Sequence, residues 1–263
     1  MAVETVLTFR EEAIVRVVMN RPEQRNAIDL ALARALREAL DDAAADDEVR
    51  AVILAGNGPT FSAGGDVKMM HEAGSAGREP LLLDVTRHFH AAVNAIATMP
   101  KPVIAAVRGG AGGGGLSLML ACDLAVVDEK AKLVVGFNAI GLTPDGGSTF
   151  HLPRMIGWRR AFELAALNET LDGKRAVELG LATRAVEAAK VDETAQALAK
   201  QLAAGPTRAF AQTKRLFRES FARGLGDAFA VESETIAATS AEADGGEGID
   251  AFVEKRPPRF RGR

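Results

Sequence analysis

Hydrophobic and polar positions along the chain alternate between short apolar runs and amphipathic stretches. Continuous apolar runs rich in β-branched residues are typical of buried strands. Such runs predict strands at 6–10, 13–18, 51–55, 103–107, 124–128 and 132–136. The first two runs are joined about Glu11 and Glu12, which predicts a hairpin.

Amphipathic stretches lie between these runs and predict helices. Asp29 is placed to cap the first helix, whose apolar positions recur at helical spacing over 30–40. Further helices are predicted at 81–98 and 115–121, and the segment 74–78 is predicted to be a loop because glycines interrupt its pattern. The repeated order of strand, strand and helix predicts an α/β fold with stacked turns.

The last part of the chain has a helical pattern throughout. Predicted helices span 191–203, 206–222, 225–240 and 247–254. Glycine and proline residues at 205–206 and 224–226 separate them. Because no linker rich in proline or serine precedes this region, we predict one domain, with a core at 1–190 and a helical C-terminal subdomain at 191–263.

Composition and charge are those of an ordinary soluble globular protein. Of the 263 residues, 48% are hydrophobic and 25% are charged, and the formal net charge is −3. This charge offers no basic field for nucleic acid. The N-terminus lacks the features of a signal peptide, and no stretch approaches the roughly 20 apolar residues of a membrane span. With the single Cys122, which we expect in the core, these features predict a cytoplasmic protein without nucleic-acid or membrane partners.

The four histidines show no metal-ligand spacing. They are His71, His88, His90 and His151. His88 and His90 are two positions apart on a predicted helix, so their side chains point to different faces. We therefore predict no metal site and no hydrolytic triad, and we interpret the histidines as surface or core residues.

Six glycines in the seven positions 109–115 are the most informative candidate for chemistry. They join the apolar strand 103–107 to the apolar helix 115–121. Glycine at such a junction leaves bare main-chain N–H groups at a helix N-terminus, where they can bind a phosphate or a developing oxyanion. The lysine of a P-loop, the spacing of a dinucleotide-binding turn and the Gly-x-Ser-x-Gly elbow are all missing. The run therefore predicts an oxyanion site or close packing of strand against helix.

A second turn of small residues lies at 61–66, with the sequence FSAGGD. It also follows a buried strand, 51–55, and Asp66 occupies the first turn of the helix after it. Two strand-to-helix turns can each offer one N–H group to the same oxygen. A thioester carbonyl held in this way acidifies its α-carbon and is stabilised as an enolate.

Six segments, taken together, carry a resemblance to a known family. They are 20–27 (NRPEQRNA), 61–66 (FSAGGD), 113–115 (GGG), 121–125 (ACDLA), 141–148 (GLTPDGGS) and 255–260 (KRPPRF). In this order and spacing they resemble the crotonase superfamily, the enoyl-CoA hydratase/isomerase family, over essentially the whole chain. The resemblance implies a superhelix of repeated ββα units. It also implies that the C-terminal helices pack on the core or on a neighbouring subunit, in a homotrimer or a dimer of trimers.

The resemblance further implies which residues bind the substrate. Gly65 and Gly114 match the family's two oxyanion-hole donors; alternatively, these glycines only permit tight turns. The other positions that match the acyl-CoA site are Arg25, Ala27, Ala63, Gly64, Asp66, Val67, Gly113 and Lys214. Asp66 is equally suited to start a helix, and Arg25 and Lys214 are equally suited to be solvated. The family implies no permanently bound cofactor: coenzyme A is part of the thioester substrate, and the C-terminal subdomain closes its cleft and forms the trimer.

Both glutamates that act in the family's hydratases are missing. Their positions hold Ser117, three residues after the second oxyanion glycine, and Phe137, four residues before the glycine of the Gly-x-x-Pro turn. Activation of water by two carboxylates therefore lacks its agents. Ser117, Phe137 and Asn138 remain candidates for contact with the acyl group, and the two polar ones can equally serve in packing or capping.

Asp145 is the candidate acid/base group. It lies in the turn 141–148, where the family's isomerases place a lone catalytic Asp or Glu. Isomerisation needs only one base, which removes a proton from one carbon and returns it to another. The alternative is that Asp145 belongs to an ordinary Pro-Asp-Gly turn and caps the following helix. The pattern is closest to the Asp-dependent isomerases, of the double-bond-shift or ring-epoxide type. Enoyl-CoA hydration and non-catalytic acyl-CoA binding are the alternatives.

Overall fold

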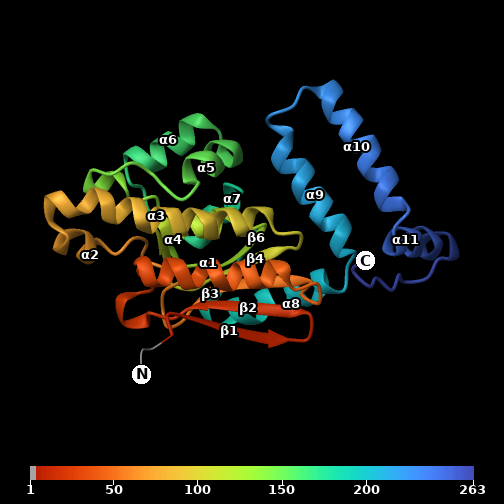
Figure 1. Cartoon of the computed structure of the whole chain (residues 1–263), viewed down its shortest axis with the longest axis horizontal. Coiled ribbons are helices and arrows are strands. Elements are labelled where there is room, and N and C mark those ends of the chain that lie inside the picture. Colours follow the sequence, from red (N-terminus) through yellow and green to blue (C-terminus); the bar gives the residue numbers. More distant parts are fainter. Residues whose placement is uncertain (1–3) are drawn as a thin grey trace.

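A six-stranded sheet forms the centre of the protein, and the computed structural model describes residues 4–263. The strand order is β1-β2-β3-β4-β6-β8 (Figure 1). The strands are β1 (Val6–Glu11), β2 (Ile14–Met19), β3 (Ala51–Gly56), β4 (Val103–Val107), β6 (Leu124–Asp128) and β8 (Arg184–Val186). β1 is antiparallel to β2, and the other neighbours are parallel. The predicted α/β class is confirmed.

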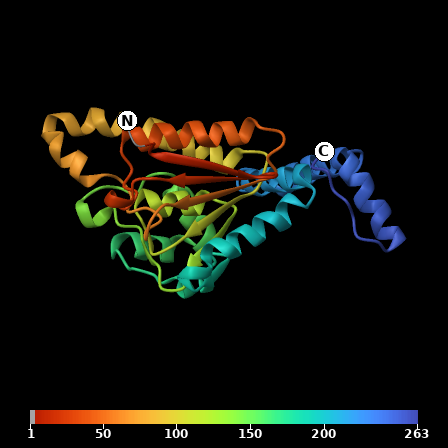
Figure 2. The same ribbon diagram turned by 90° about the horizontal axis from the view of Figure 1, so that it is seen from below.

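Helices cover both faces of this sheet because its central strands are apolar on both sides. Leu54 of β3 packs in one core with α1 (Leu30–Ala45) and α3 (Gly74–Thr98), whereas Ile53 packs in a second core with α8 (Val191–Ala203). Successive residues of a strand point to opposite faces, so one continuous apolar run serves two cores. Figure 2 shows α1 and α8 on opposite sides of the sheet.

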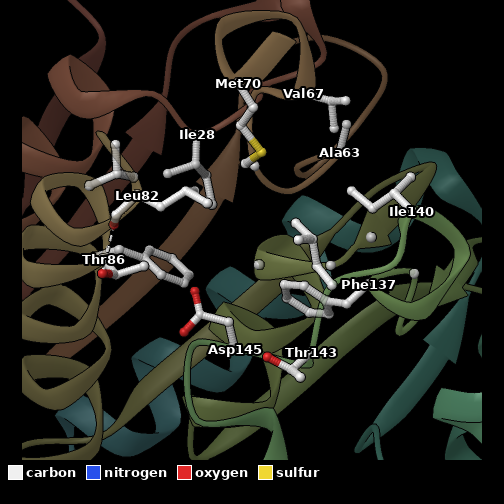
Figure 3. A pocket seen from close by; sticks show the side chains of 18 of the residues that line it. Ile28, Ala63, Val67, Met70, Leu82, Thr86, Phe137, Ile140, Thr143 and Asp145 are labelled. Atoms are coloured by element: carbon white, nitrogen blue, oxygen red, sulfur yellow. Dashed lines mark hydrogen bonds between the residues drawn. The ribbon is translucent and has the colours of Figure 1, made fainter. Parts of the chain in front are cut away.

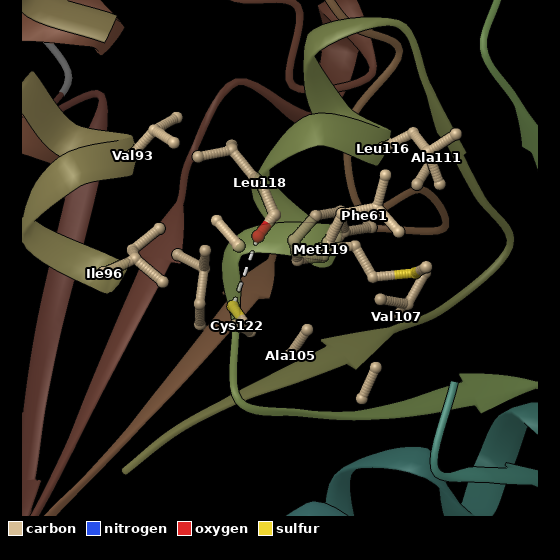
Figure 4. Packing of buried hydrophobic residues seen from close by; sticks show 14 of the residues in the cluster. Phe61, Val93, Ile96, Ala105, Val107, Ala111, Leu116, Leu118, Met119 and Cys122 are labelled. Atoms are coloured by element: carbon tan, nitrogen blue, oxygen red, sulfur yellow. Dashed lines mark hydrogen bonds between the residues drawn. The ribbon is translucent and has the colours of Figure 1, made fainter. Parts of the chain in front are cut away.

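A smaller sheet of two strands lies beside the main sheet and brings the two glycine turns together. β5 (Gly110–Gly112) pairs with β7 (Lys132–Val134), and a bridge joins the turn at Ser62 to β5. α4 (Gly114–Ala121) begins two residues after β5 and is buried over its whole length (Figure 4). A Cβ on Gly115 would lie only 2.4 Å from the carbonyl oxygen of Ser62, so the close stacking of these turns requires glycine there.

Cys122 follows α4 directly and is buried, which confirms that it belongs to the core. Its thiol lies 3.3 Å from the carbonyl oxygen of Leu118 (Figure 4). Burial raises the pKa of this thiol far above its usual range, so the thiolate that a nucleophile needs does not form.

The other helices surround this centre. They are α2 (Val67–Glu72), α5 (Ser148–Ile156), α6 (Trp158–Ala166), α7 (Gly173–Glu178), α9 (Thr207–Ser220), α10 (Leu225–Ser240) and α11 (Ala243–Glu254), with 3₁₀ helices at Pro22–Gln24, Asn138–Ile140 and Ala188–Lys190. α9, α10 and α11 project from the sheet as an arm (Figure 1). Every residue of α10 is at least partly exposed. In the described part of the chain, no helix combines the length and the apolar character that a membrane span requires.

Several boundaries differ from those expected. The segment 74–78 was wrongly predicted as a loop: α3 already begins at Gly74 and runs for 25 residues. Each glycine lowers helix stability by only about 1 kcal/mol, which the packing of so long a helix offsets. β7 ends at Val134 rather than 136, before Gly136 takes a left-handed φ of 75°. α11 begins at Ala243 rather than 247. β5, β8 and the short helices α6 and α7 had no counterpart in the predicted elements.

α8 belongs with the sheet and not with the arm. Its buried residues, Val191, Ala195, Leu198 and Ala199, form the second core, whereas α9 buries only Thr207. The division into 1–190 and 191–263 stays a prediction, and the chain leaves the sheet after α8.

Candidate active site

A cavity of about 360 Å³ opens between α3 and the stacked glycine turns (Figure 3). Its volume lies in the range of about 300–1,000 Å³ that is usual for small-molecule sites. Most of its wall is apolar, with side chains such as Ile28, Met70 and Leu82. Seven residues selected from the sequence also line it: Ala63, Gly65, Val67, Gly113, Gly114, Phe137 and Asp145.

Two main-chain N–H groups in the wall, those of Gly65 and Gly114, have no acceptor among the described residues. Gly114 is the first residue of α4, where an N–H has no intrahelical partner. Gly65 lies opposite Ile28, but the hydrogen bonds of that bridge run through Gly64 and Asp66. The two turns touch, since a Cβ on Gly64, whose φ is 92°, would lie 3.1 Å from the Gly114 nitrogen. The wall therefore offers two free donors, as an oxyanion site requires.

Three of the residues selected for the coenzyme A side, Arg25, Ala27 and Asp66, lie around the first glycine turn without lining the cavity. The carbonyl of exposed Arg25 accepts a hydrogen bond from the Ala63 nitrogen at 2.9 Å. The carbonyl of Ala27 accepts one from the Arg21 guanidinium. Asp66 caps α2 and lies 3.3 Å from Arg21. These contacts fasten the segment 21–27 to the turn, and whether Arg25, Ala27 and Asp66 also contact coenzyme A stays a prediction.

Asp145 provides the one titratable side chain among the described lining residues. It enters the cavity from the turn 141–148 (Figure 3). Its Oδ1 accepts a hydrogen bond from the Gly146 nitrogen at 2.5 Å, while Oδ2 has no partner within residues 4–263. Gly146 has a φ of 62°, and a Cβ there would lie 2.5 Å from the Phe89 ring, so glycine lets the turn approach the helix α3. A free carboxylate oxygen is thus available to the cavity.

Ser117 supports this turn from beneath. Its side chain is buried and donates to the carbonyl oxygen of Asp145 at 2.7 Å, and Ser148 donates to the same oxygen at 2.9 Å. Asn138 lies outside the cavity lining and makes a long contact of 3.4 Å to the Leu142 carbonyl. Of the three candidates for acyl contact, Phe137 alone presents its side chain to the cavity.

His90 contacts Asp145 and was not selected from the sequence as a site residue. It lies on α3, and its Nε2 hydrogen-bonds Asp145 Oδ1. His88, two positions earlier, faces α1 instead, where Arg34 Nε lies 3.3 Å from its Nε2. His90 and Asp145 are 55 positions apart, so no local pattern joins them. Within residues 4–263, no cluster of three His, Cys, Asp or Glu side chains has the arrangement of a metal site.

Lys214 lies away from the cavity, at the base of the arm. Its ammonium donates to Asp123 Oδ2 at 2.7 Å and to the carbonyl of Ile96 at 2.7 Å, and its side chain is 12% exposed. Burial raises the pKa of Asp123, and the Lys214 charge opposes that rise. This partly buried pair fastens α9 to the core. A contact between Lys214 and a coenzyme A nucleotide stays a prediction.

The cavity therefore combines two kinds of group. Free main-chain N–H groups can donate hydrogen bonds to a carbonyl oxygen, and the carboxylate of Asp145 can move a proton. In an apolar enclosure, such donors stabilise developing negative charge more strongly than water does. The arrangement is suited to a reaction that passes through an enolate.

Known proteins resemble this chain over nearly its whole length. The model of the enoyl-CoA hydratase/isomerase family matches residues 10–263. A probable enoyl-CoA hydratase from Rhodobacter capsulatus is 35% identical over 265 residues, with 100% of each chain covered. A 1,2-epoxyphenylacetyl-CoA isomerase from Escherichia coli is 34% identical over 260 residues, with 99% of each chain covered. The crystal structure of an enoyl-CoA hydratase from a Polaromonas species has a TM-score of 0.93 at 34% identity, covering 97% of this chain and 99% of that one.

Proposed function

Because the chain belongs to the enoyl-CoA hydratase/isomerase family, with the crotonase fold, we propose that it isomerises an unsaturated or epoxide-bearing acyl-CoA thioester. The observation that carries this proposal is the free Oδ2 of Asp145 in a cavity that has no other carboxylate among its described lining residues. One base is enough for a proton shift between two carbons, whereas two are usual for addition of water.

The reaction follows from the two walls of the cavity. The thioester oxygen accepts hydrogen bonds from the N–H groups of Gly65 and Gly114, which lowers the energy of the enolate. Asp145 Oδ2 takes a proton from the acyl chain as the C–H bond breaks, and the electron pair moves onto the thioester oxygen. The carboxylic acid then returns the proton to a different carbon, the carbonyl re-forms, and the double bond has moved.

Enoyl-CoA hydration is the second candidate, and one observation favours it. His90 adds a second proton-transfer group to Asp145, and the pair together can activate a water. The position of His90 favours isomerisation over hydration. His90 is not part of the lining of the cavity, so it reaches the acyl group only through Asp145.

A turnover screen with 2-enoyl, 3-enoyl and aromatic acyl-CoA thioesters tests the proposal, with products identified by mass and retention. Isomerisation leaves the mass of the thioester unchanged, whereas hydration adds one water. A product heavier by one water would replace the isomerase with a hydratase. Binding of acyl-CoA without any conversion across the panel would favour a non-catalytic acyl-CoA binder.

We also propose that the protein forms a trimer or a dimer of trimers. The arm supports this, because it exposes large apolar side chains that a solitary chain leaves in water. These include Phe217, Phe221, Leu225, Phe229, Ile236 and Phe252, of which Phe252 is 86% exposed. Sedimentation equilibrium decides the matter: a monomeric mass at micromolar concentration would refute it.

A further inference from the structure

A second groove adjoins Asp145, and its wall contains both polar and apolar side chains. It is lined by His90 and Asn94 of α3, His151 of α5 and Arg218 of α9, among others. Asp145 lines both the apolar cavity and this groove. Asp145 is therefore accessible both from the acyl cavity and from a groove that contains several polar side chains.

The two carboxylate oxygens of Asp145 have different environments. Oδ1 accepts from the Gly146 nitrogen and is hydrogen-bonded to His90 Nε2, whereas Oδ2 is free among the described residues. The His90 side chain is 54% exposed, so the far edge of its ring is in water. An imidazole in this position touches both the base and the solvent.

We propose that His90 exchanges the proton of Asp145 with solvent during turnover, so that part of the product carries a hydrogen from water. The inference rests on the proposed isomerase function and concerns the fate of the proton that Asp145 removes. His90 acts here through Asp145 and does not touch the substrate.

For each proton that His90 passes to water, one proton from water returns to Asp145. Asp145 receives a proton from the acyl chain on Oδ2 and becomes a carboxylic acid. While Asp145 is a carboxylate, His90 Nε2 carries the hydrogen of their hydrogen bond. Once Asp145 is a carboxylic acid, the neutral imidazole gives this hydrogen to water and takes one from water on Nδ1. Rotation about the Asp145 Cβ–Cγ bond then brings the O–H to the bare Nε2, which accepts the proton, and His90 becomes an imidazolium. The exposed imidazolium exchanges its N–H hydrogens with water and returns one to Asp145, which delivers it to the acyl chain. Because direct return competes with this route, only part of the product is labelled.

The other charged groups of the groove do not offer the same route. Arg218 donates to the carbonyl of Ala97 at 2.8 Å, and a guanidinium does not release its proton near neutral pH. His151 makes no hydrogen bond to Asp145 among the described contacts, and burial with nearby Arg154 lowers its pKa. His90 is therefore the titratable side chain of the groove that joins Asp145 to water, beside the 31% of the Asp145 side chain that is itself exposed.

Deuterium incorporation tests the exchange. The wild-type protein, His90→Gln and His88→Gln are each given a 3-enoyl-CoA in D₂O, and deuterium per product molecule is measured by mass spectrometry at partial conversion. The glutamine amide can still donate to Asp145 Oδ1, but it cannot take up a proton. We expect labelled product from the wild type and at least about fivefold less label per turnover from His90→Gln. His88→Gln, the same change on the opposite face of α3, should label like the wild type.

Three results would overturn the inference. Isomerised product without label from the wild type would mean that Asp145 keeps its proton, and equal label from His90→Gln would mean that water reaches Asp145 directly. Failure of the wild type to isomerise any substrate would instead refute the proposed function, and the exchange with it. Should His90→Gln fold poorly by circular dichroism, His90→Asn gives the same comparison with a shorter amide.

Discussion

The two walls of the acyl cavity are built in different ways. One wall consists of main chain: the turns at Gly65 and Gly114 present N–H groups that no side chain has to place. The other wall consists of one side chain, Asp145, which is held by contacts from α3, α4 and its own turn. The fold of the backbone alone places the N–H groups of the first wall. The position of Asp145 in the second wall depends on several residues that are far apart in sequence. Substitutions should therefore affect the two walls differently.

The largest effect is expected at the main-chain wall. Gly114→Pro removes one donor, at a position where proline suits the start of a helix, so the fold should persist. Turnover should fall by about 10²–10³-fold, the usual cost of losing one oxyanion donor. Gly114→Ala is the matched control: its Cβ would lie 3.2 Å from Ile28 and Phe89, but its N–H remains. Steady-state kinetics of both variants measure the difference. Equal losses would assign the effect to crowding and not to the missing N–H.

A smaller effect is expected beneath the side-chain wall. Ser117→Ala removes the hydrogen bond that the Ser117 hydroxyl donates to the Asp145 carbonyl oxygen. The hydrogen bond from Ser148 to the same oxygen remains. Because the turn is loosened and not lost, we expect kcat to fall about tenfold with KM nearly unchanged. The free energy of unfolding should decrease by about 1 kcal/mol. Ser240→Ala on the arm is the control. A rise in KM at constant kcat would mean that Ser117 contacts substrate and does not position Asp145.

The smallest effect on catalysis is expected at the chain end, remote from both walls. Hydrogen bonds from Arg256 and from the Arg259 nitrogen lower the pKa of Glu247 to about 2. A lowered carboxyl pKa means that this contact is intact above the ordinary pKa of 4.5 and is lost as the pH falls toward 2. Limited proteolysis of the tail should thus increase over that range in the wild type. Glu247→Gln should show the increase already at neutral pH, with turnover unchanged; a loss of turnover there would tie the tail to the site.

The main-chain wall was predictable from sequence, and the side-chain wall only in part. Glycine-rich turns between apolar runs are local signals that point to the two turns, and the resemblance to the family selects Gly65 and Gly114 within them. Asp145 could be selected from its turn and from the missing glutamates. His90 could not, because its partner is brought to it by the packing of α3 against the turn 141–148.

Lys214, in contrast to His90, was selected from the sequence, but its surroundings could not be predicted. A solvated lysine and a partly buried one look alike in a helical pattern. Only the fold reveals that the Lys214 ammonium contacts Asp123 and two carbonyl oxygens. The start of α3 was also wrongly predicted, because the packing of the helix and not its local sequence decides where it begins. Glycines that usually mark a loop are tolerated when a long helix packs along its length.

The central claim is that Asp145 is the single base of an acyl-CoA isomerase. Asp145→Asn tests it most directly, because the amide keeps the size of the side chain and its acceptor for Gly146 but cannot take up a proton. Isomerase turnover and coenzyme A affinity are measured side by side on the wild type and the variant. We expect turnover to fall by about 10²-fold or more and the affinity for coenzyme A to stay within about twofold. An Asp145→Asn variant that isomerises at the wild-type rate would contradict the account and move the base elsewhere.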